Sequence, residues 1–343
     1  MVLGTTVLEA ASSASSGSLN SGRLSARPDA RLGQLLGQLE GLAVQQRDVA
    51  FNTRELAMAP EDGALVVGRS ERYGLREHAF AQLATKLQIP AHYLRRCEPE
   101  LRAENVNRWL REQDRDVFLR LEGGEVRAVL SPSYRPINHL EILRWLEQRL
   151  GNVAVRYELT EAFLDLQVVR DGPVNLPAQS RDPLHRGVHL RNSEIGAARV
   201  SVSAMVYRTI CLNGLILGGG QWGYERRHIG KSELPEEVRG AFDKAFELSA
   251  QATTAFAGTR GIMVSEPAKV LAKLAERYEL VEDEAAALRV AFNTEPGESL
   301  YAVVNAVTRA GNSEHLPLPS RHKLQTLGGR IVDLVASGKR WLD

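Results

Sequence analysis

Residues 187–231, GVHLRNSEIGAARVSVSAMVYRTICLNGLILGGGQWGYERRHIGK, contain the strand pattern that decides the fold. Apolar and polar side chains alternate through 199–207, and a period of two is that of a β-strand with one face on a core. Turn-forming residues at 192–196 separate this strand from an earlier one. We therefore predict two paired strands, over 187–191 and 197–208. The side chains expected on the core face are Val200, Val202, Ala204 and Val206.

The opposite face of this strand pair is predicted to be polar and accessible. A strand with such a face presents it either to water or to a partner. Between Arg181 and Lys231 the chain has eight Lys or Arg residues against three Asp or Glu, so the local charge is positive. The polar face is expected to carry Arg199, Ser201, Ser203 and Tyr207, with His189 and Arg191 from the partner strand.

Hairpins and helices alternate in the chain before this segment, which indicates an α+β fold. Two apolar runs flank Gly123-Gly124, a favourable hairpin turn, and a second hairpin is expected over 152–170. A helix with core spacing is predicted between them, over 139–150. This order predicts an antiparallel sheet of hairpins backed by helices, with a helical C-terminal third.

The chain is predicted to divide into three parts. Residues 1–30 form a Ser-rich arm with little to bury, and we expect it to be disordered. Residues 31–262 form the α+β core domain, and residues 263–343 form a helical C-terminal subdomain. The other expected elements are strands around 49–51 and 64–67 and helices at 32–42, 76–89, 100–113, 232–256, 266–278, 283–292, 297–310 and 321–337.

The composition limits the classes of function. The net charge is +1, so attraction to an anionic partner must come from a local patch. Arg outnumbers Lys by 36 to 7, which suits bidentate phosphate contacts, although a GC-rich genome also favours Arg codons. Cys97 and Cys211 are too few for a disulfide framework or a cysteine zinc site. Without a signal-peptide pattern or a long apolar run, we expect a cytoplasmic protein.

Three partial motifs each lack a required residue. Gly230-Lys231-Ser232 resembles the end of a phosphate-binding P-loop, but Glu225 stands where that loop needs glycine. His139-Leu140-Glu141 matches half of the zinc deaminase signature, and the cysteine half is absent. His185 and His189 are spaced like helical metal ligands, yet they lie in an extended segment with no evident third ligand. We therefore predict no metal and no cofactor.

Glu194 and His228 are the weak candidates for catalysis. A carboxylate and an imidazole can act as acid and base or can hold a metal ion. The residues Arg191 and Arg199 flank the turn that contains Glu194, and they favour a different interpretation, a turn residue in an ion pair.

Basic and aromatic side chains of the central segment form the stronger candidate site. Guanidinium and ammonium groups neutralise phosphates, and aromatic rings stack on the bases of single strands, worth about 1–3 kcal/mol per base. The alternative is a solvated face whose charges pair with acidic helices. The predicted nucleic-acid-binding residues are Arg135, His189, Arg191, Arg199, Tyr207, Arg208, Trp222, Tyr224, Arg226, Arg227, His228 and Lys231, with Tyr134 as a further stacking ring.

Four stretches, in this order, resemble the phage/plasmid-like protein family catalogued as domain of unknown function 932. They are SPSYRPINHLEIL (131–143), NSEIGAARVSVSAMVYRTICLNGLI (192–216), RRHIG (226–230) and YAVVNAVTRAG (301–311). The resemblance begins near Tyr73 and implies residence among mobile elements, with no assigned chemistry. The residues that it maps are Tyr134, Arg135, 192–196, Arg208, 213–214, His228 and 305–306.

We expect a homo-oligomer that binds single-stranded DNA and has no membrane partner. Mobile elements carry recombination accessory proteins, and sheets of hairpins backed by helices occur in phage strand-annealing proteins, so annealing is the expected use by analogy of fold. Two alternatives stay open. One is an assembly protein that does not bind DNA, and the other is a nucleic-acid-processing enzyme that uses Glu194 and His228.

Overall fold

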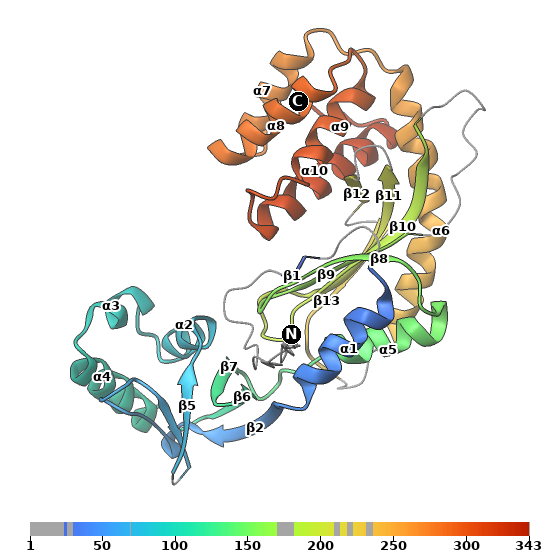
Figure 1. The fold of residues 1–343 in the computed structure, drawn as a ribbon. Helices are drawn as coiled ribbons and strands as arrows, with labels where there is room; N and C mark the ends of the chain where they lie inside the picture. The colour runs from blue at the N-terminus through green and yellow to red at the C-terminus, as the bar shows by residue number, and fades with distance from the viewer. Residues whose placement is uncertain are drawn as a thin grey trace, which may run out of the picture.

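The computed structural model describes residues 24–25, 30–68, 70–169, 182–208, 213–217, 222–230 and 236–342. It confirms the predicted α+β fold, with two mostly antiparallel sheets and a helical C-terminal region. Figure 1 shows the larger sheet in the centre, the smaller sheet at one end and the last helices at the other. Most of the predicted Ser-rich arm, residues 1–23 and 26–29, lies outside the described residues.

The larger sheet has seven strands and contains the central segment. Its order is β1-β8-β9-β10-β11-β12, and β13 also pairs with β11. In the β10–β11 pair, His189 lies opposite Ser203 and Arg191 opposite Ser201, so these residues share one face as predicted. The strands are β1 (Leu24–Ser25), β8 (Val155–Leu159), β9 (Leu164–Val169), β10 (Leu184–Asn192), β11 (Val200–Arg208), β12 (Asn213–Leu217) and β13 (Gly223–Arg226).

The smaller sheet has six strands in the order β2-β6-β7-β5-β4-β3. Its β6–β7 hairpin turns at Gly123-Gly124, as predicted, and its one parallel pair is β5 with β7. Helices α2, α3 and α4 pack on it, and Leu83, Val106 and Leu119 share their core. The elements are β2 (Gln46–Asn52), η1 (Thr53–Glu55), β3 (Leu56–Met58), β4 (Leu65–Val67), β5 (Glu71–Leu75), α2 (Glu77–Lys86), α3 (Ala91–Arg96), α4 (Pro99–Glu112), β6 (Asp116–Glu122) and β7 (Glu125–Leu130).

Three helices cover the apolar face of the larger sheet. They are α1 (Leu32–Ala43), α5 (His139–Leu150) and α6 (Glu236–Gly258). Leu35, Leu143 and Phe242 pack there against Val188 and Val202. The predicted core face is therefore confirmed, because Val200, Val202, Ala204 and Val206 are all fully buried.

Helix α10 (Leu318–Ala336) crosses the opposite, polar face of the larger sheet. Arg321 forms an ion pair with Glu158 of β8, and the Gln325 side chain accepts a hydrogen bond from Gln167 of β9 at 3.5 Å. Further along the helix, Gly329 lies so close to β12 that a β-carbon would overlap the Ile216 carbonyl. The sheet thus lies between helices on both faces.

This cover corrects the prediction that the polar face is accessible. His189 is fully buried, and Ser203 and Tyr207 are 6% and 8% exposed. Part of this face is itself apolar, because Tyr207 packs there with Met205 and Ile216 in a small cluster. The strand pattern predicted which side chains share a face, and the cover comes from residues more than a hundred positions away.

The last helices continue the core of the larger sheet. Leu217 of β12, Phe256 of α6 and Val304 of α9 belong to one apolar cluster, which spans both sides of position 262. No helix among the described residues is long and apolar enough to cross a membrane. The remaining elements are η3 (Thr259–Gly261), α7 (Pro267–Arg277), α8 (Glu282–Thr294) and α9 (Leu300–Ala310).

Candidate nucleic-acid interface

A groove of about 760 Å³ lies between α2 of the smaller sheet and the loops at one end of β10, β11 and β13. Its walls are residues 78–86 of α2, the end of β7 with the turn that follows it (129–134), the β10–β11 connection (196–199) and residues 227–229. This volume is within the range of about 300–1,000 Å³ that is usual for small-molecule sites. It suits a few nucleotides or a ligand of similar size.

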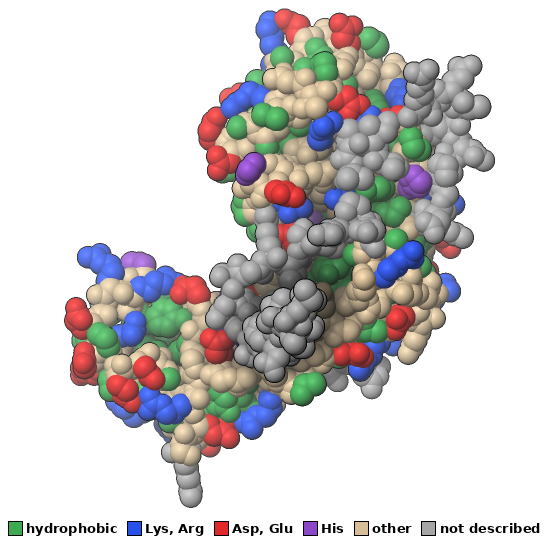
Figure 2. Space-filling model, viewed as in Figure 1, with side chains coloured by type: hydrophobic (Ala, Val, Ile, Leu, Met, Phe, Trp, Pro, Cys, Tyr) green, Lys and Arg blue, Asp and Glu red, His purple; other side chains and the backbone are tan. Residues whose placement is uncertain are grey.

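The groove is basic. Lys86, Arg199 and Arg227 line it, and its described lining residues include no Asp or Glu. Arg199 reaches Glu225 outside the groove at 3.5 Å, but both side chains are more than half exposed, so this pair is weak. Elsewhere, on the face shown in Figure 2, basic and acidic side chains are interspersed over the described surface. The groove therefore differs from that surface, because its lining has cations and no described carboxylates.

Lys86 is the half-buried cation of the groove. Burial lowers the pKa of its ammonium group, and the nearby charge of Arg115 lowers it further. A desolvated cation gains from an anionic ligand more than a fully hydrated one does, because the attraction is less screened. Lys86 is thus placed to meet a phosphate.

Tyr134 and His228 form the floor of the groove. Their rings are stacked, with centroids 5.2 Å apart and planes 7° from parallel. Burial, together with the charges of His139 and Arg120, lowers the pKa of His228 to about 4, so its ring is neutral near neutral pH. Both ring nitrogens of His228 are inaccessible, so His228 contributes to the floor through its stacking on Tyr134.

The β10–β11 connection is held rigidly behind the groove. His78 and Gln82 of α2 both bond to the Ile195 carbonyl, at 3.1 and 2.8 Å. The Tyr134 hydroxyl donates to the carbonyls of Ser193 and Glu194, each at 3.2 Å. Loops fixed in this way lose little entropy when a ligand binds.

Gly196 is the turning point of this connection. Its φ is +76°, a left-handed conformation that favours glycine. A β-carbon at this position would also lie 2.8 Å from Leu130 Cδ2 on the groove wall. The turn that brings Arg199 to the groove therefore depends on glycine.

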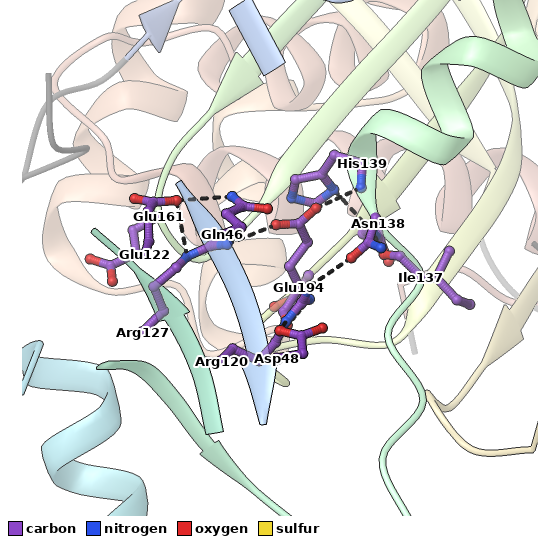
Figure 3. A network of polar contacts seen from close by, with 12 residues as sticks. Gln46, Asp48, Arg120, Glu122, Arg127, Ile137, Asn138, His139, Glu161 and Glu194 are labelled. Carbon is purple, nitrogen blue, oxygen red and sulfur yellow. Dashed lines mark hydrogen bonds and ion pairs between the residues drawn. The ribbon is translucent and has the colours of Figure 1, made fainter. Parts of the chain in front are cut away.

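Glu194 lies at the junction of the two sheets (Figure 3), where its carboxylate is fully engaged. One oxygen accepts from the backbone N–H of His139 at 2.7 Å, and the other accepts from Arg127 at 3.1 Å. Arg120 donates to the Glu194 carbonyl at 2.8 Å and also binds Asp48. The network joins β2, β6 and β7 of the smaller sheet to the β10–β11 connection and to the start of α5.

The electrostatics of Glu194 suit a structural role. Burial alone raises the pKa of the carboxyl, but His139, Arg127 and Arg120 outweigh burial and bring it to about 2. A carboxylate held ionised by the Arg127 and Arg120 guanidinium groups and by the His139 backbone N–H is a poor general base near neutral pH. The interpretation of Glu194 as a turn residue in an ion pair is therefore confirmed, with Arg127 as the partner and not a flanking arginine.

Besides His228 in the groove floor, four predicted contact residues are buried, which corrects their assignment to an exposed binding face. Trp222 is 4% exposed and donates through its indole N–H to Asp333 of α10, so its ring cannot stack on a base. Arg208 is 3% exposed and pairs with Asp182 and Glu295. Tyr207 and His189 lie under the helical cover of the polar face.

Of the other predicted residues, Arg199, Arg227 and His228 line the groove, whereas Arg135, Tyr224, Arg226 and Arg191 do not. Arg135 is exposed, and its backbone N–H donates to the His228 carbonyl at 2.8 Å, so it lies next to the groove floor. Tyr224 and Arg226 both bind Glu237 of α6 at 3.1 Å.

Arg191 does not line the groove. Its guanidinium lies 4.2 Å from the ring centre of Phe163. Lys231 lies outside the described residues.

Lys86, His78 and Gln82 were missed by the sequence analysis. All three lie on α2, which was interpreted by its apolar face, with Phe80, Leu83 and Leu87 at helical spacing. Nothing local in the sequence indicates that the polar face of α2 meets residues 195–199. The polar face of α2 meets these residues because the smaller sheet and its helices lie against the β10–β11 connection of the larger sheet.

Comparison of the chain with protein-family models, with curated proteins and with solved structures gave no match. The similarity of four stretches to the phage/plasmid-like family therefore stays a prediction.

Proposed function

We propose that this chain binds single-stranded nucleic acid in the basic groove. The observation that carries the proposal is the convergence of Lys86, Arg199 and Arg227 on a groove without described carboxylates. Arg199, Arg227 and His228 come from the segment whose charge pattern predicted such a site. Arg135 beside the groove floor extends the positive path.

A single strand fits the groove better than a duplex. Proteins read duplex DNA by inserting a helix or a β-ribbon into a groove of the DNA, which requires a protruding element. This site is concave, and concave basic grooves are how single strands are bound. Ile229, 53% exposed at the rim, offers apolar surface to a base. Stacking on Tyr207 or Trp222 is no part of the proposal.

Fluorescence anisotropy with labelled single-stranded and duplex oligonucleotides, at several salt concentrations, tests the proposal. Each phosphate neutralised contributes about −0.7 to the slope of log K against log salt for single strands. Three groove cations therefore predict a slope of about −2. A salt-independent affinity, or equal affinity for duplex and single strands, contradicts the proposal.

A pair of double variants tests the location. Lys86→Gln/Arg227→Gln removes two groove cations, so the slope should fall to about −0.7 and the affinity should drop. Arg96→Gln/Lys244→Gln makes the same change in net charge at two exposed positions outside the groove. If both double variants weaken binding equally, the groove is not the site.

The two alternatives are tested with the same protein. An assembly protein that ignores nucleic acid would show no binding at either low or physiological salt. The expected homo-oligomer is measured by light scattering with and without a single-stranded oligonucleotide. The ion pair of the Glu194 carboxylate argues against an enzyme that uses this residue. Divalent-metal-dependent cleavage of an oligonucleotide would instead support the enzyme alternative.

A further inference from the structure

Three potential metal ligands meet between the larger sheet and α10. Asp165 lies on β9, His189 on β10 and His322 on α10, and one donor atom from each lies within 4.8 Å of the others. Asp165 and His189 are buried at 6% and 0% exposure. The cluster is on the polar face of the sheet, outside the basic groove.

The contacts within the cluster leave donor atoms over. His189 Nε2 lies 2.7 Å from Asp165 Oδ1, a hydrogen bond, and His322 Nδ1 lies 3.8 Å from Asp165 Oδ2, which is too long for one. The two imidazole rings are 5.1 Å apart and tilted by 31°. Among these three polar side chains there is thus a single hydrogen bond, the one between His189 and Asp165.

Three polar atoms of the cluster are buried without a contact. Asp165 Oδ2, His189 Nδ1 and His322 Nδ1 are inaccessible and have no hydrogen-bond partner among the residues that the structure describes. Buried polar atoms almost always have a partner, because an unpaired one loses its hydration without compensation. His322 Nδ1 and Asp165 Oδ2 face each other at 3.8 Å without a hydrogen bond, and His189 Nε2 adjoins the same carboxylate. Three side chains that meet from separate elements in this way indicate a missing ligand, because packing alone gives no reason to retain them.

A small cavity adjoins the cluster. It has a volume of about 40 Å³, and its walls include Asp165, His322, Gln167 and Gln325. A cavity needs about 10–15 Å³ of such space to hold one water. Room therefore exists beside the donors for a bound water or another small ligand, as a site with fewer than four protein ligands requires.

We propose that Asp165, His189 and His322 bind a divalent first-row transition metal ion, with the remaining positions filled from the cavity. Two imidazoles and one carboxylate suit zinc or ferrous iron, whereas magnesium and calcium prefer oxygen ligands alone. Metal–ligand distances of about 2.0–2.2 Å require the three side chains to close in slightly. His322, 25% exposed, is the one with room to rotate. This inference goes beyond the proposed function and does not depend on it.

Metal content and affinity of the full, tag-free chain test the proposal. After treatment with a chelator, the protein is dialysed against zinc, ferrous or magnesium ions, and bound metal is measured by mass spectrometry. We expect about one zinc or iron per chain and no retained magnesium. Zinc affinity is then measured by competition with a chromogenic chelator.

His322→Gln should weaken zinc binding by at least about 10–100-fold, the loss usual for even an indirect partner of a ligand. His315→Gln removes an exposed histidine three residues before α10 and should leave the affinity unchanged. Asp165→Asn keeps the side-chain shape and serves as a second variant, with circular dichroism to show that each protein is folded. Equal zinc affinity in wild type and a folded His322→Gln variant, or no zinc bound by wild type, overturns the proposal.

Discussion

Two guanidinium groups and the first N–H of α5 surround Glu194, so its charge is needed where it lies. Glu194→Gln would remove the nearer of the two carboxylates that pair with the buried Arg127, 3% exposed, and would leave Glu122 at 3.5 Å. Breaking a buried pair by removing one partner typically costs about 3–5 kcal/mol. We expect the free energy of unfolding, measured by urea denaturation, to fall by about this amount.

The matched control for this change is Glu247→Gln on the exposed face of α6. Substitutions at exposed positions without special contacts usually change stability by less than about 0.5 kcal/mol. A Glu194→Gln variant as stable as the Glu247→Gln variant would show that the network around Glu194 is dispensable for the fold.

The stability of the protein is expected to fall in acid. Burial lowers the pKa of both His139 and His228 to about 4, below the ordinary value of 6.5. Between these pH values the unfolded chain binds more protons than the folded chain, so stability decreases as the pH falls through this window. Glu194, with its pKa lowered from 4.5 to about 2, continues the loss in stronger acid.

Urea denaturation at neutral pH and at intervals down to pH 4 measures this dependence. Between pH 6.5 and about 4, the His228→Gln variant should lose less stability than wild type, because one neutral buried histidine is gone. Stability that stays constant or rises as the pH falls to 4 would contradict the assignment of these histidines as neutral.

Sequence reasoning at single residues succeeded where the partner is local. The alternation in 199–207 identified the buried valines of β11. It could not identify Arg127 as the partner of Glu194, or Asp165 and His322 as neighbours of His189, because these partners come from other elements. The search for a third ligand near His185 and His189 failed for the same reason.

Among the elements, α10 depends on a close approach to the larger sheet. Gly329→Ala would place a β-carbon on the Ile216 carbonyl, so the helix must shift away from β12. Forcing extra volume into a packed interface typically costs about 1–3 kcal/mol. Gly240 in α6 has nothing within 4 Å of the corresponding position. Gly240→Ala should therefore stabilise the protein by about 0.4–1 kcal/mol.

Both glycine variants are compared with wild type by urea denaturation under the same conditions. If Gly329→Ala stabilises the protein as much as Gly240→Ala, α10 does not pack on β12 as described. The comparison separates the contact from the general effect of replacing glycine in a helix, since that effect is common to both.

Local pattern predicted most elements well. The helix over 139–150 matches α5, and the Gly123-Gly124 hairpin matches β6 and β7. Helix α3 was missed, because it is a short helix after Pro90 and its pattern merges with that of α2. The strands were also expected in one sheet and form two. Hairpin signals identify neighbouring strands and contain no information on which hairpins join.

In the whole molecule, the C-terminal helices share an apolar cluster with the larger sheet. Deletion of residues 263–343 would expose Leu217 and Trp222 and would remove α10 from the polar face. We expect the shortened chain to lose cooperative thermal unfolding and to bind a hydrophobic dye. A fragment 1–262 that unfolds cooperatively would show that the last helices form an independent subdomain.

The position of α10 has a consequence for how the protein is made. The ribosome synthesises this helix after every strand that it covers, and the Glu158–Arg321 pair joins residues 163 positions apart. At about 5–20 residues per second, the stretch from Leu217 to Ala336 takes on the order of ten seconds to produce. Throughout that interval the nascent sheet has one face uncovered, so the growing chain is most in need of chaperones during its last third.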